Sequence, residues 1–363
     1  MSQPTPRHWA LGLALSLAAA WLAGAVFLDT VQPVSFDTAL NLYVATPGTT
    51  SRTRGEGWAS SSVGEHGIRG LPGGRLPEGP KVAFWGDSFV EGLQVDDGPR
   101  MAQKFTELAG SAGLESAGRK LAGVGLGHGG DALPDFLLKA RATAPALGDV
   151  RLHVFVLPRM ADLQPGAFRI GRASFLSSPE YHLVPGDDRP SQAALALAPT
   201  FRRLELAGAF AVYERLRSFS PRLSPGPVPA PSPAIAATAP AQPSTEAMRF
   251  LVTHALRTAR ETGGGAVFLR LPFLPWLRGG RVALDDPEEA LARSFAAVCA
   301  ENGAGFIDLG PDFRALFLQT GRFPRGFFNA PPDSGHLNGE GHRLVAQAVV
   351  RYIQEHPDAL LAR

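Results

Sequence analysis

Apolar residues along the chain fall into short continuous runs, which are separated by longer stretches of helical periodicity. The runs with the character of buried strands are residues 81–85, 152–157, 266–271 and 305–309. Apolar residues recur at helical spacing over residues 101–112, 132–144, 244–262, 287–302 and 339–355. Short apolar runs that alternate with amphipathic helices are typical of a parallel sheet covered by helices on both faces. The pattern therefore predicts an α/β domain that begins near residue 81.

A longer apolar run lies near the N-terminus. Residues 9–28 contain no charged residue and match the ~20 residues that cross a bilayer core as a helix. Arg7 precedes the run and Asp29 follows it, so the positive-inside rule places the rest of the chain outside the cytoplasm. Small residues inside the run also suit a signal peptidase. We expect residues 1–29 to be a single-pass bacterial inner-membrane anchor or a signal peptide, with the remainder in the periplasm or extracytoplasmic space.

Two stretches lack hydrophobic periodicity. Residues 30–80 are rich in Gly, Ser, Thr and Pro and are interpreted as a stalk and lead-in, and residues 220–244 form a Pro-rich loop. That loop belongs to an insertion at about 165–245, which also carries apolar residues at helical spacing over 204–219. The main domain is expected to span residues 81–363.

Composition excludes several classes of protein. With 363 residues, 45% hydrophobic and 19% charged, the chain buries a large core and is not disordered as a whole. The net charge is +2, and no basic cluster is long enough to follow a phosphate backbone, so nucleic acid is not an expected partner. Cys299 is the single cysteine, which excludes an intramolecular disulfide. His336 and His342 lack the spacing of metal ligands on one helical face, so neither a metal nor a cofactor is predicted.

Candidate chemistry lies at the two ends of the predicted domain. Gly86, Asp87 and Ser88 follow the first strand, where a serine projects from the C-terminal edge of a parallel sheet beside a helix N-terminus. Near the other end, Asp333 precedes His336 by one turn, which can place a carboxylate against Nδ1 and leave Nε2 free to accept a proton. Each motif alone is also common in ordinary turns and helix caps.

The two motifs together are more specific. GDSF after the first strand and DSGHLNGEGH before the last helix resemble the SGNH (GDSL-type) hydrolase family, over about residues 63–355 in a discontinuous way. The sequence around Ser88 and the N-terminal apolar run are similar to membrane-anchored, extracytoplasmic members linked to acylation of envelope glycans. The resemblance implies a flavodoxin-like three-layer α/β/α sandwich with a parallel sheet. It also implies that Ser88 is the nucleophile, His336 the general base and Asp333 the acid that orients it.

The same resemblance implies an oxyanion hole in which the N–H of Ser88 is joined by a glycine N–H. Residues 121–131 occupy the position of the family's glycine block. Gly127 matches the donor best, and its neighbours Gly125 and Gly129 stay open as alternatives.

The family's second oxyanion donor, an asparagine side chain, has no counterpart. Ala161 stands where the asparagine is expected. Losing one such donor typically lowers turnover by about 10² to 10³. Arg159 is a candidate substitute.

The resemblance implies a serine esterase or O-acyltransferase that removes or transfers ester-linked acyl groups, acetyl as the first expectation, on a cell-envelope or exported glycan. The alternative is a catalytically impaired accessory protein that binds glycan for a partner acyltransferase in the membrane. Retention of all three triad residues favours the enzyme. Residues 125–130 also satisfy G-x-G-x-x-G, but the preceding strand is weak and no acidic residue is well placed about 20 positions on, so a dinucleotide site is not expected.

Overall fold

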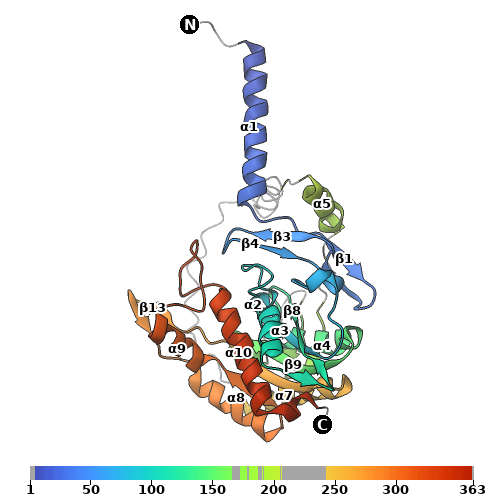
Figure 1. Ribbon diagram of the computed structural model, residues 1–363, viewed down its shortest axis with the longest axis vertical. Coiled ribbons are helices and arrows are strands. Elements are labelled where there is room, and N and C mark those ends of the chain that lie inside the picture. Colours follow the sequence, from blue (N-terminus) through green and yellow to red (C-terminus); the bar gives the residue numbers. More distant parts are fainter. Residues whose placement is uncertain are drawn as a thin grey trace, which may run out of the picture. The chain divides into compact units, whose positions relative to one another are not determined.

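The computed structural model describes residues 5–165, 172–177, 180–186, 190, 192–204, 206 and 243–361 (Figure 1). It divides into two compact units: Met1–Pro33 with Ser191–Gln242, and Val34–Pro190 with Pro243–Arg363. The predicted helix over 204–219 and the Pro-rich loop over 220–244 lie almost wholly outside the described residues.

The first unit contains the N-terminal helix α1 (Pro6–Phe27), together with α5 (Gln192–Arg203). Proline suits the first position of α1 because its missing N–H would have no partner inside the helix. The helix has a mean hydropathy of 2.0 over its most apolar window and is long and apolar enough to cross a membrane. It extends the predicted apolar run by one turn at its N-terminal end.

A five-stranded parallel sheet forms the centre of the second unit. Its strands are β5 (Lys81–Gly86), β8 (Ala122–Gly127), β9 (Val150–Leu157), β12 (Gly265–Arg270) and β15 (Gly305–Asp308). They lie in the order β15-β12-β9-β5-β8. Numbered along the chain, the five strands read 2-1-3-4-5, the doubly wound order of flavodoxin-like folds. The strand order reverses beside β5.

Strand β8 is the one member of this sheet that the apolar pattern does not predict. Its sequence, AGVGLG, has glycine at alternate positions. A Cβ built on Gly123 would lie 2.2 Å from the backbone oxygen of Ala102 in the helix that packs on it. The close approach of helix and strand requires glycine here, and glycine removes the apolar signal of a buried strand.

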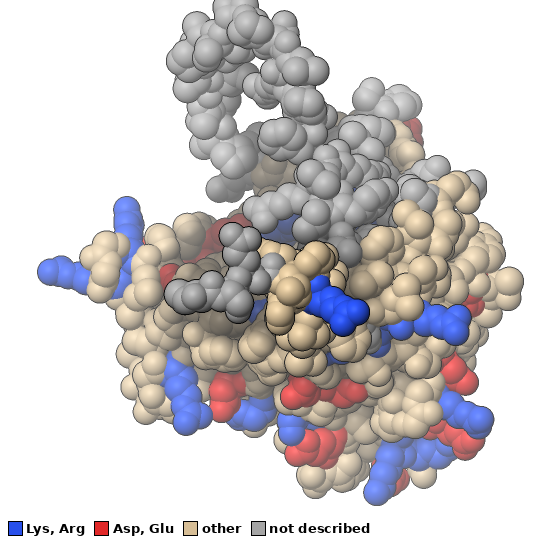
Figure 2. All heavy atoms as spheres, turned by 90° about the horizontal axis from the view of Figure 1, so that it is seen from above, with Lys and Arg blue, Asp and Glu red and all other residues tan. Residues whose placement is uncertain are grey.

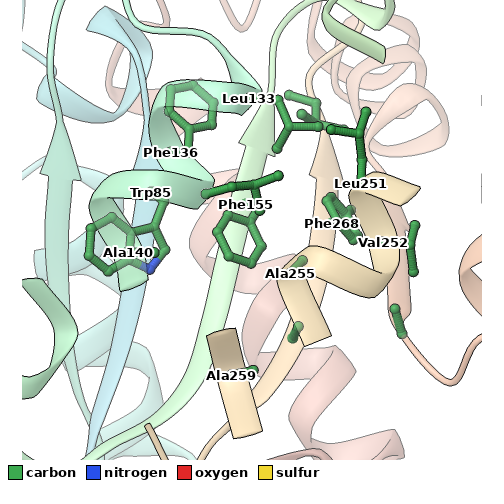
Figure 3. Packing of buried hydrophobic residues seen from close by; sticks show 14 of the residues in the cluster. Trp85, Leu133, Phe136, Ala140, Phe155, Leu251, Val252, Ala255, Ala259 and Phe268 are labelled. Atoms are coloured by element: carbon green, nitrogen blue, oxygen red, sulfur yellow. The ribbon is translucent and has the colours of Figure 1, made fainter. Parts of the chain in front are cut away.

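Helices cover both faces of the sheet. The helices α3 (Met101–Ser111), α9 (Gly310–Thr320) and α10 (Gly339–Glu355) pack on one face, and α4 (Leu133–Leu147), α7 (Thr245–Glu261) and α8 (Glu289–Glu301) pack on the other. Each face forms an apolar cluster with its helices. Along β9, Val154 and Val156 belong to the cluster with α3, α9 and α10, and Phe155 belongs to the cluster with α4, α7 and α8, because successive side chains of a strand point to opposite faces. Figure 3 shows Trp85, Phe155 and Phe268 packed with side chains of α4 and α7.

Two-stranded antiparallel hairpins lie before the central sheet in the chain and in the segments between its strands and helices. The first are β1 (Val34–Asp37) with β2 (Leu42–Ala45) and β3 (Thr50–Thr53) with β4 (Ala59–Ser62). The others are β6 (Glu115–Ser116) with β7 (Arg119–Lys120), β10 (Ser174–Leu176) with β11 (His182–Val184), and β13 (Trp276–Arg278) with β14 (Arg281–Ala283). Short 3₁₀ helices are η1 (Glu65–Gly67), η2 (Pro72–Gly74), η3 (Met160–Leu163) and η4 (Pro357–Leu360).

The interpretation of residues 30–80 as a stalk is wrong from Val34 onward, because this segment belongs to the same compact unit as the sheet. It is held by polar contacts. Ser51 and Ser61 share a buried hydrogen bond of 2.8 Å across β3 and β4, and Ser62 Oγ donates to Asp97 Oδ2 at 2.6 Å. Hydroxyl contacts of this kind leave no hydrophobic periodicity in the sequence.

Charged side chains on the described part of the face in Figure 2 are interspersed, with basic and acidic groups side by side. One exposed ion pair joins Arg141 Nε and Glu261 Oε2 at 2.9 Å. Exposed pairs of this kind typically contribute about 0–1 kcal/mol. Stability therefore comes mainly from the two apolar clusters that flank the sheet.

A buried chain of hydrogen bonds lies within the apolar cluster that contains Trp85. Trp85 Nε1–H donates to His153 Nδ1 at 3.1 Å, so the Nε2–H of the same ring donates to Thr262 Oγ1 at 2.8 Å. The two contacts fix the neutral imidazole with its proton on Nε2. Burial lowers the pKa of His153 to about 4.

We expect the protein to lose stability as the pH falls from about 6.5 towards 4. In this window the unfolded chain protonates His153 and the folded chain does not, which lowers the free energy of unfolding by on the order of 3 kcal/mol. His153→Gln should reduce the difference in unfolding free energy between pH 7.5 and 4.5, measured by denaturant titration. The exposed His356→Gln is the control, and an unchanged difference in His153→Gln would contradict the assignment. Burial lowers the pKa of His342 to about 3, so His342 acts in the same direction. The free energy of unfolding of His153→Gln should therefore still fall somewhat as the pH falls.

Candidate active site

Ser88 is the first residue of the short helix α2 (Ser88–Glu91), which starts directly after β5. Asp87 caps this helix, since its Oδ1 accepts the N–H of Phe89 at 2.9 Å. Gly86 is required by the tight turn, because a Cβ built there would lie 2.3 Å from Val90 Cγ2. The serine therefore lies at the carboxyl end of the strand where the sheet order reverses, the usual position of a site in doubly wound folds.

His336 lies against this serine. The hydroxyl of Ser88 is 2.8 Å from His336 Nε2, although the two residues are 248 positions apart. The loop that carries the histidine is held by the N–H of Gly326, which donates to His336 O at 3.1 Å. The ring of Phe89 packs against the imidazole with 5.1 Å between centroids. The structure thus brings the predicted nucleophile and base into contact.

The carboxylate on the other side of the imidazole is Glu56. His336 Nδ1–H donates to Glu56 Oε2 at 2.6 Å, and the backbone N–H of His336 donates to Oε1 at 2.7 Å. Burial raises the pKa of Glu56, but the hydrogen bonds from His336 lower it by more, so it lies below its usual value. Glu56 is ionised at neutral pH and fixes the tautomer that leaves Nε2 as an acceptor facing Ser88.

The expectation that Asp333 orients the histidine is wrong in this geometry. Asp333 Oδ2 accepts the N–H of Leu277 at 2.7 Å and ties its loop to the β13–β14 hairpin. Gly335 turns the chain with φ +72°, and a Cβ built there would lie 2.0 Å from Glu56 Oε1. The turn thus gives Glu56 the place that Asp333 was expected to take.

Glu56 lies in the turn that joins β3 to β4, and a clamp of side-chain amide contacts holds this turn. Asn329 Oδ1 accepts the N–H of Gly57 at 2.8 Å, and Asn329 Nδ2 donates to the carbonyls of Arg54 and Gly57 at 2.9 and 3.0 Å. A separation of 280 residues between Glu56 and His336 leaves no local motif to reveal the pair.

Gly127, the expected oxyanion donor in residues 121–131, is oriented differently from the expectation. His128 N–H donates to Gly86 O at 3.1 Å, so the amide of Gly127 points to the side of β8 away from β5. A Cβ on Gly127 would lie 2.1 Å from Glu91 N, which explains the glycine by packing against α2. A Cβ on Gly129 would lie 3.9 Å from Ser88 Cβ. Of the glycines left open by the sequence, Gly129 lies beside Ser88, whereas the N–H of Gly127 points away from the strand that leads to Ser88.

Arg159 and Ala161 lie after β9, where the family's second donor was expected. Arg159 Nε is 3.6 Å from Asp162 Oδ1, and half of the Arg159 side chain is exposed. Burial raises the pKa of Asp87, and the hydrogen bond from the Phe89 N–H and the charge of Arg159 partly oppose this rise. Ala161 is exposed in η3. A donor role for Arg159 stays a prediction.

A buried arginine that the sequence analysis did not single out lies beneath the site. The Arg325 side chain is 1% exposed, and its Nη2 donates to the carbonyls of Leu271 and Pro272 at 3.0 Å each. Its guanidinium carbon lies 4.8 Å from the ring centre of Phe89 and 4.0 Å from that of Phe273. Burial lowers the pKa of Arg325 to about 9, with Asp87 opposing the shift, so the group stays charged at neutral pH.

Within the described residues, no three His, Cys, Asp or Glu side chains gather so as to hold a metal ion. His128, from the glycine loop, contacts Asp131 Oδ1 at 3.2 Å.

Comparison with known proteins adds little to this geometry. No family model matches the chain, and no curated protein matches it. A solved structure of an α/β hydrolase enzyme from the metagenome of Lake Arreo, Spain, is 11% identical and aligns over 76% of this chain and 95% of its own, with a TM-score of 0.38. A likeness at this level carries no argument about activity.

Proposed function

We propose that the protein is an extracytoplasmic serine esterase or O-acyltransferase of the SGNH type, in which Ser88, His336 and Glu56 form the catalytic triad. The continuous chain of contacts from Glu56 through His336 to Ser88, at 2.6 and 2.8 Å, carries the proposal. A nucleophile, a base and an acid that orients the base are what acyl transfer requires.

The mechanism follows from the tautomer that Glu56 fixes. His336 Nε2 takes the hydroxyl proton of Ser88 as Oγ attacks the ester carbonyl, and Glu56 stabilises the imidazolium that forms. The imidazolium then gives this proton to the departing alkoxide, which leaves an acyl group on Ser88. Water or a sugar hydroxyl attacks next, with His336 again as the base. The N–H of Ser88, at the N-terminus of α2, is the first donor to the oxyanion.

The surroundings of the triad support a glycan ester as the substrate. Trp58, two residues after Glu56, is exposed, as is Phe273, which packs on Phe89 beside the histidine. Phe328 is 83% exposed on the loop that clamps the Glu56 turn. Exposed aromatic rings offer apolar platforms on which sugar rings stack. Together with the family resemblance, this favours an acylated, first of all acetylated, polysaccharide.

One observation favours the second candidate, an accessory protein that binds glycan without turning it over. The N–H of Gly129 already donates to Glu91 Oε2 at 3.0 Å, and Ala161 supplies no donor. An oxyanion hole without these two donors is weaker. The completeness of the triad leads us to prefer the enzyme.

One labelling experiment tests both the activity and the side of the membrane on which Ser88 lies. A membrane-impermeant fluorophosphonate should label Ser88 in intact spheroplasts, and the purified protein should hydrolyse p-nitrophenyl acetate. Ser88→Ala should remove both signals, whereas Ser111→Ala, an exposed serine on α3, should retain them. Folded wild-type protein that is neither labelled nor active would support the accessory protein, and labelling only after lysis would refute the extracytoplasmic location.

A further inference from the structure

The carboxylate of Glu91 joins two segments that flank the nucleophile. Glu91 is the last residue of α2, three positions after Ser88. Its Oε2 accepts the N–H of Gly129 at 3.0 Å, and its Oε1 accepts Nε of Arg69 at 3.1 Å. The side chains of Arg69 and Glu91 are only 8% and 15% exposed, so water competes little for these contacts.

The other end of Arg69 reaches the hairpin that carries Glu56. Arg69 Nη1 donates to Ser51 Oγ at 2.7 Å and to Ser61 Oγ at 3.3 Å. Ser51 lies on β3 and Ser61 on β4, and the turn between these strands holds Glu56. A single buried network therefore runs from the hairpin of the acid, through Arg69 and Glu91, to the helix of the nucleophile.

The network has a specific geometric task. Glu56 must lie within hydrogen-bond distance of His336 while His336 contacts Ser88, and the three residues come from distant parts of the chain. A misplacement of about 1 Å in such an arrangement costs on the order of 10²-fold in rate. A buried ion pair whose members are both hydrogen-bonded is better suited to fixing such a distance than to adding stability.

We propose that Glu91 is a positioning residue, which acts through Arg69 to hold the Glu56 hairpin in register with Ser88 and His336. This inference rests on the proposed hydrolase or acyltransferase function. Glu91 contacts none of the reacting atoms. Its second contact, with Gly129, holds the glycine loop beside the nucleophile.

The test compares Glu91→Gln with the wild-type protein in p-nitrophenyl acetate hydrolysis. Glutamine keeps the shape, but it turns an N–H towards one of the two donors, Arg69 or Gly129. We expect kcat to fall about 10- to 100-fold, with KM changed less than threefold. The exposed Glu107→Gln on α3, which breaks the surface pair with Lys104, should leave both constants unchanged.

A cycle with Glu56→Gln separates positioning from general destabilisation. If Glu91 acts through Glu56, adding Glu91→Gln to Glu56→Gln should lower kcat by less than threefold further. Arg69→Lys keeps the charge but cannot reach Glu91 and both serines together, so it should reproduce the fall in kcat. This variant replaces Glu91→Gln in the test if Glu91→Gln does not fold.

The outcomes distinguish this inference from the proposed function. An active, Ser88-labelled wild type with an unimpaired Glu91→Gln variant would overturn the positioning role alone. A full loss that persists in the Glu56→Gln background would also overturn it. A rise in kcat would show that Glu91 masks the Gly129 N–H and would refute positioning, whereas unlabelled, inactive wild-type protein would overturn both proposals.

Discussion

Glu56→Gln is expected to lower kcat for ester hydrolysis by about 10³ to 10⁴-fold, whereas Asp333→Asn should change it by less than about threefold. A neutral amide neither stabilises the imidazolium nor selects the tautomer with its proton on Nδ1. Asp333 is engaged with the backbone of Leu277 and lies outside this chain of contacts. Because the pKa of Glu56 is below its usual value, its carboxylate stays ionised to a lower pH than that of an ordinary glutamate.

The measurement is the kcat of both variants on p-nitrophenyl acetate, alongside the rate of fluorophosphonate labelling at Ser88. Melting temperatures of the same samples control for unfolding. A large loss in Asp333→Asn together with an active Glu56→Gln would return the role of the acid to the position that the sequence motif indicates.

Arg325→Ala is expected to lower the free energy of unfolding by at least about 3 kcal/mol. Buried carbonyls that lose their donors cost about 1–3 kcal/mol each, and the cavity left under Phe89 and Phe273 adds to this. Arg325 Nη1 also contacts the carbonyl of Gly335, next to His336, at 3.4 Å, so the histidine loop should lose its order as well.

Urea denaturation of Arg325→Ala and of the exposed Arg322→Ala provides the measurement and its control. Arg322 is 69% exposed, so its removal should change stability by less than about 1 kcal/mol. Equal stability of the two variants would show that the buried guanidinium contributes nothing to the fold. Loss of Ser88 labelling in Arg325→Ala at temperatures well below its melting point would show that the histidine loop depends on this residue.

Local patterns in the sequence predicted the parts of the fold that depend on local physics. Strands β5, β9, β12 and β15 are continuous apolar runs, and Ser88 and His336 each lie in a compact motif at a strand end or before a helix. Strand β8 was not predicted, because its close packing against α3 requires glycine and glycine gives no apolar signal. The parallel sheet and the contact between Ser88 and His336 therefore followed from the sequence.

The rest of the site depends on contacts between distant segments. Glu56 belongs to a polar hairpin without hydrophobic alternation, and its partner lies 280 residues away. Arg325 is buried against backbone carbonyls and aromatic rings, which no spacing rule identifies. The nearby Asp333 had the right distance in sequence from His336, but the turn at Gly335 directs the chain so that a different carboxylate reaches the imidazole.

The hairpin that supplies Glu56 has a consequence for how the protein matures. The proposed acid and base are 280 positions apart, so the proposed triad can form only after both segments have been made and have folded together. Proteolysis before residue 34 would leave Glu56, Ser88 and His336 together in one compact unit, whereas cleavage between Glu56 and β5 would leave Ser88 and His336 without the carboxylate that contacts the imidazole.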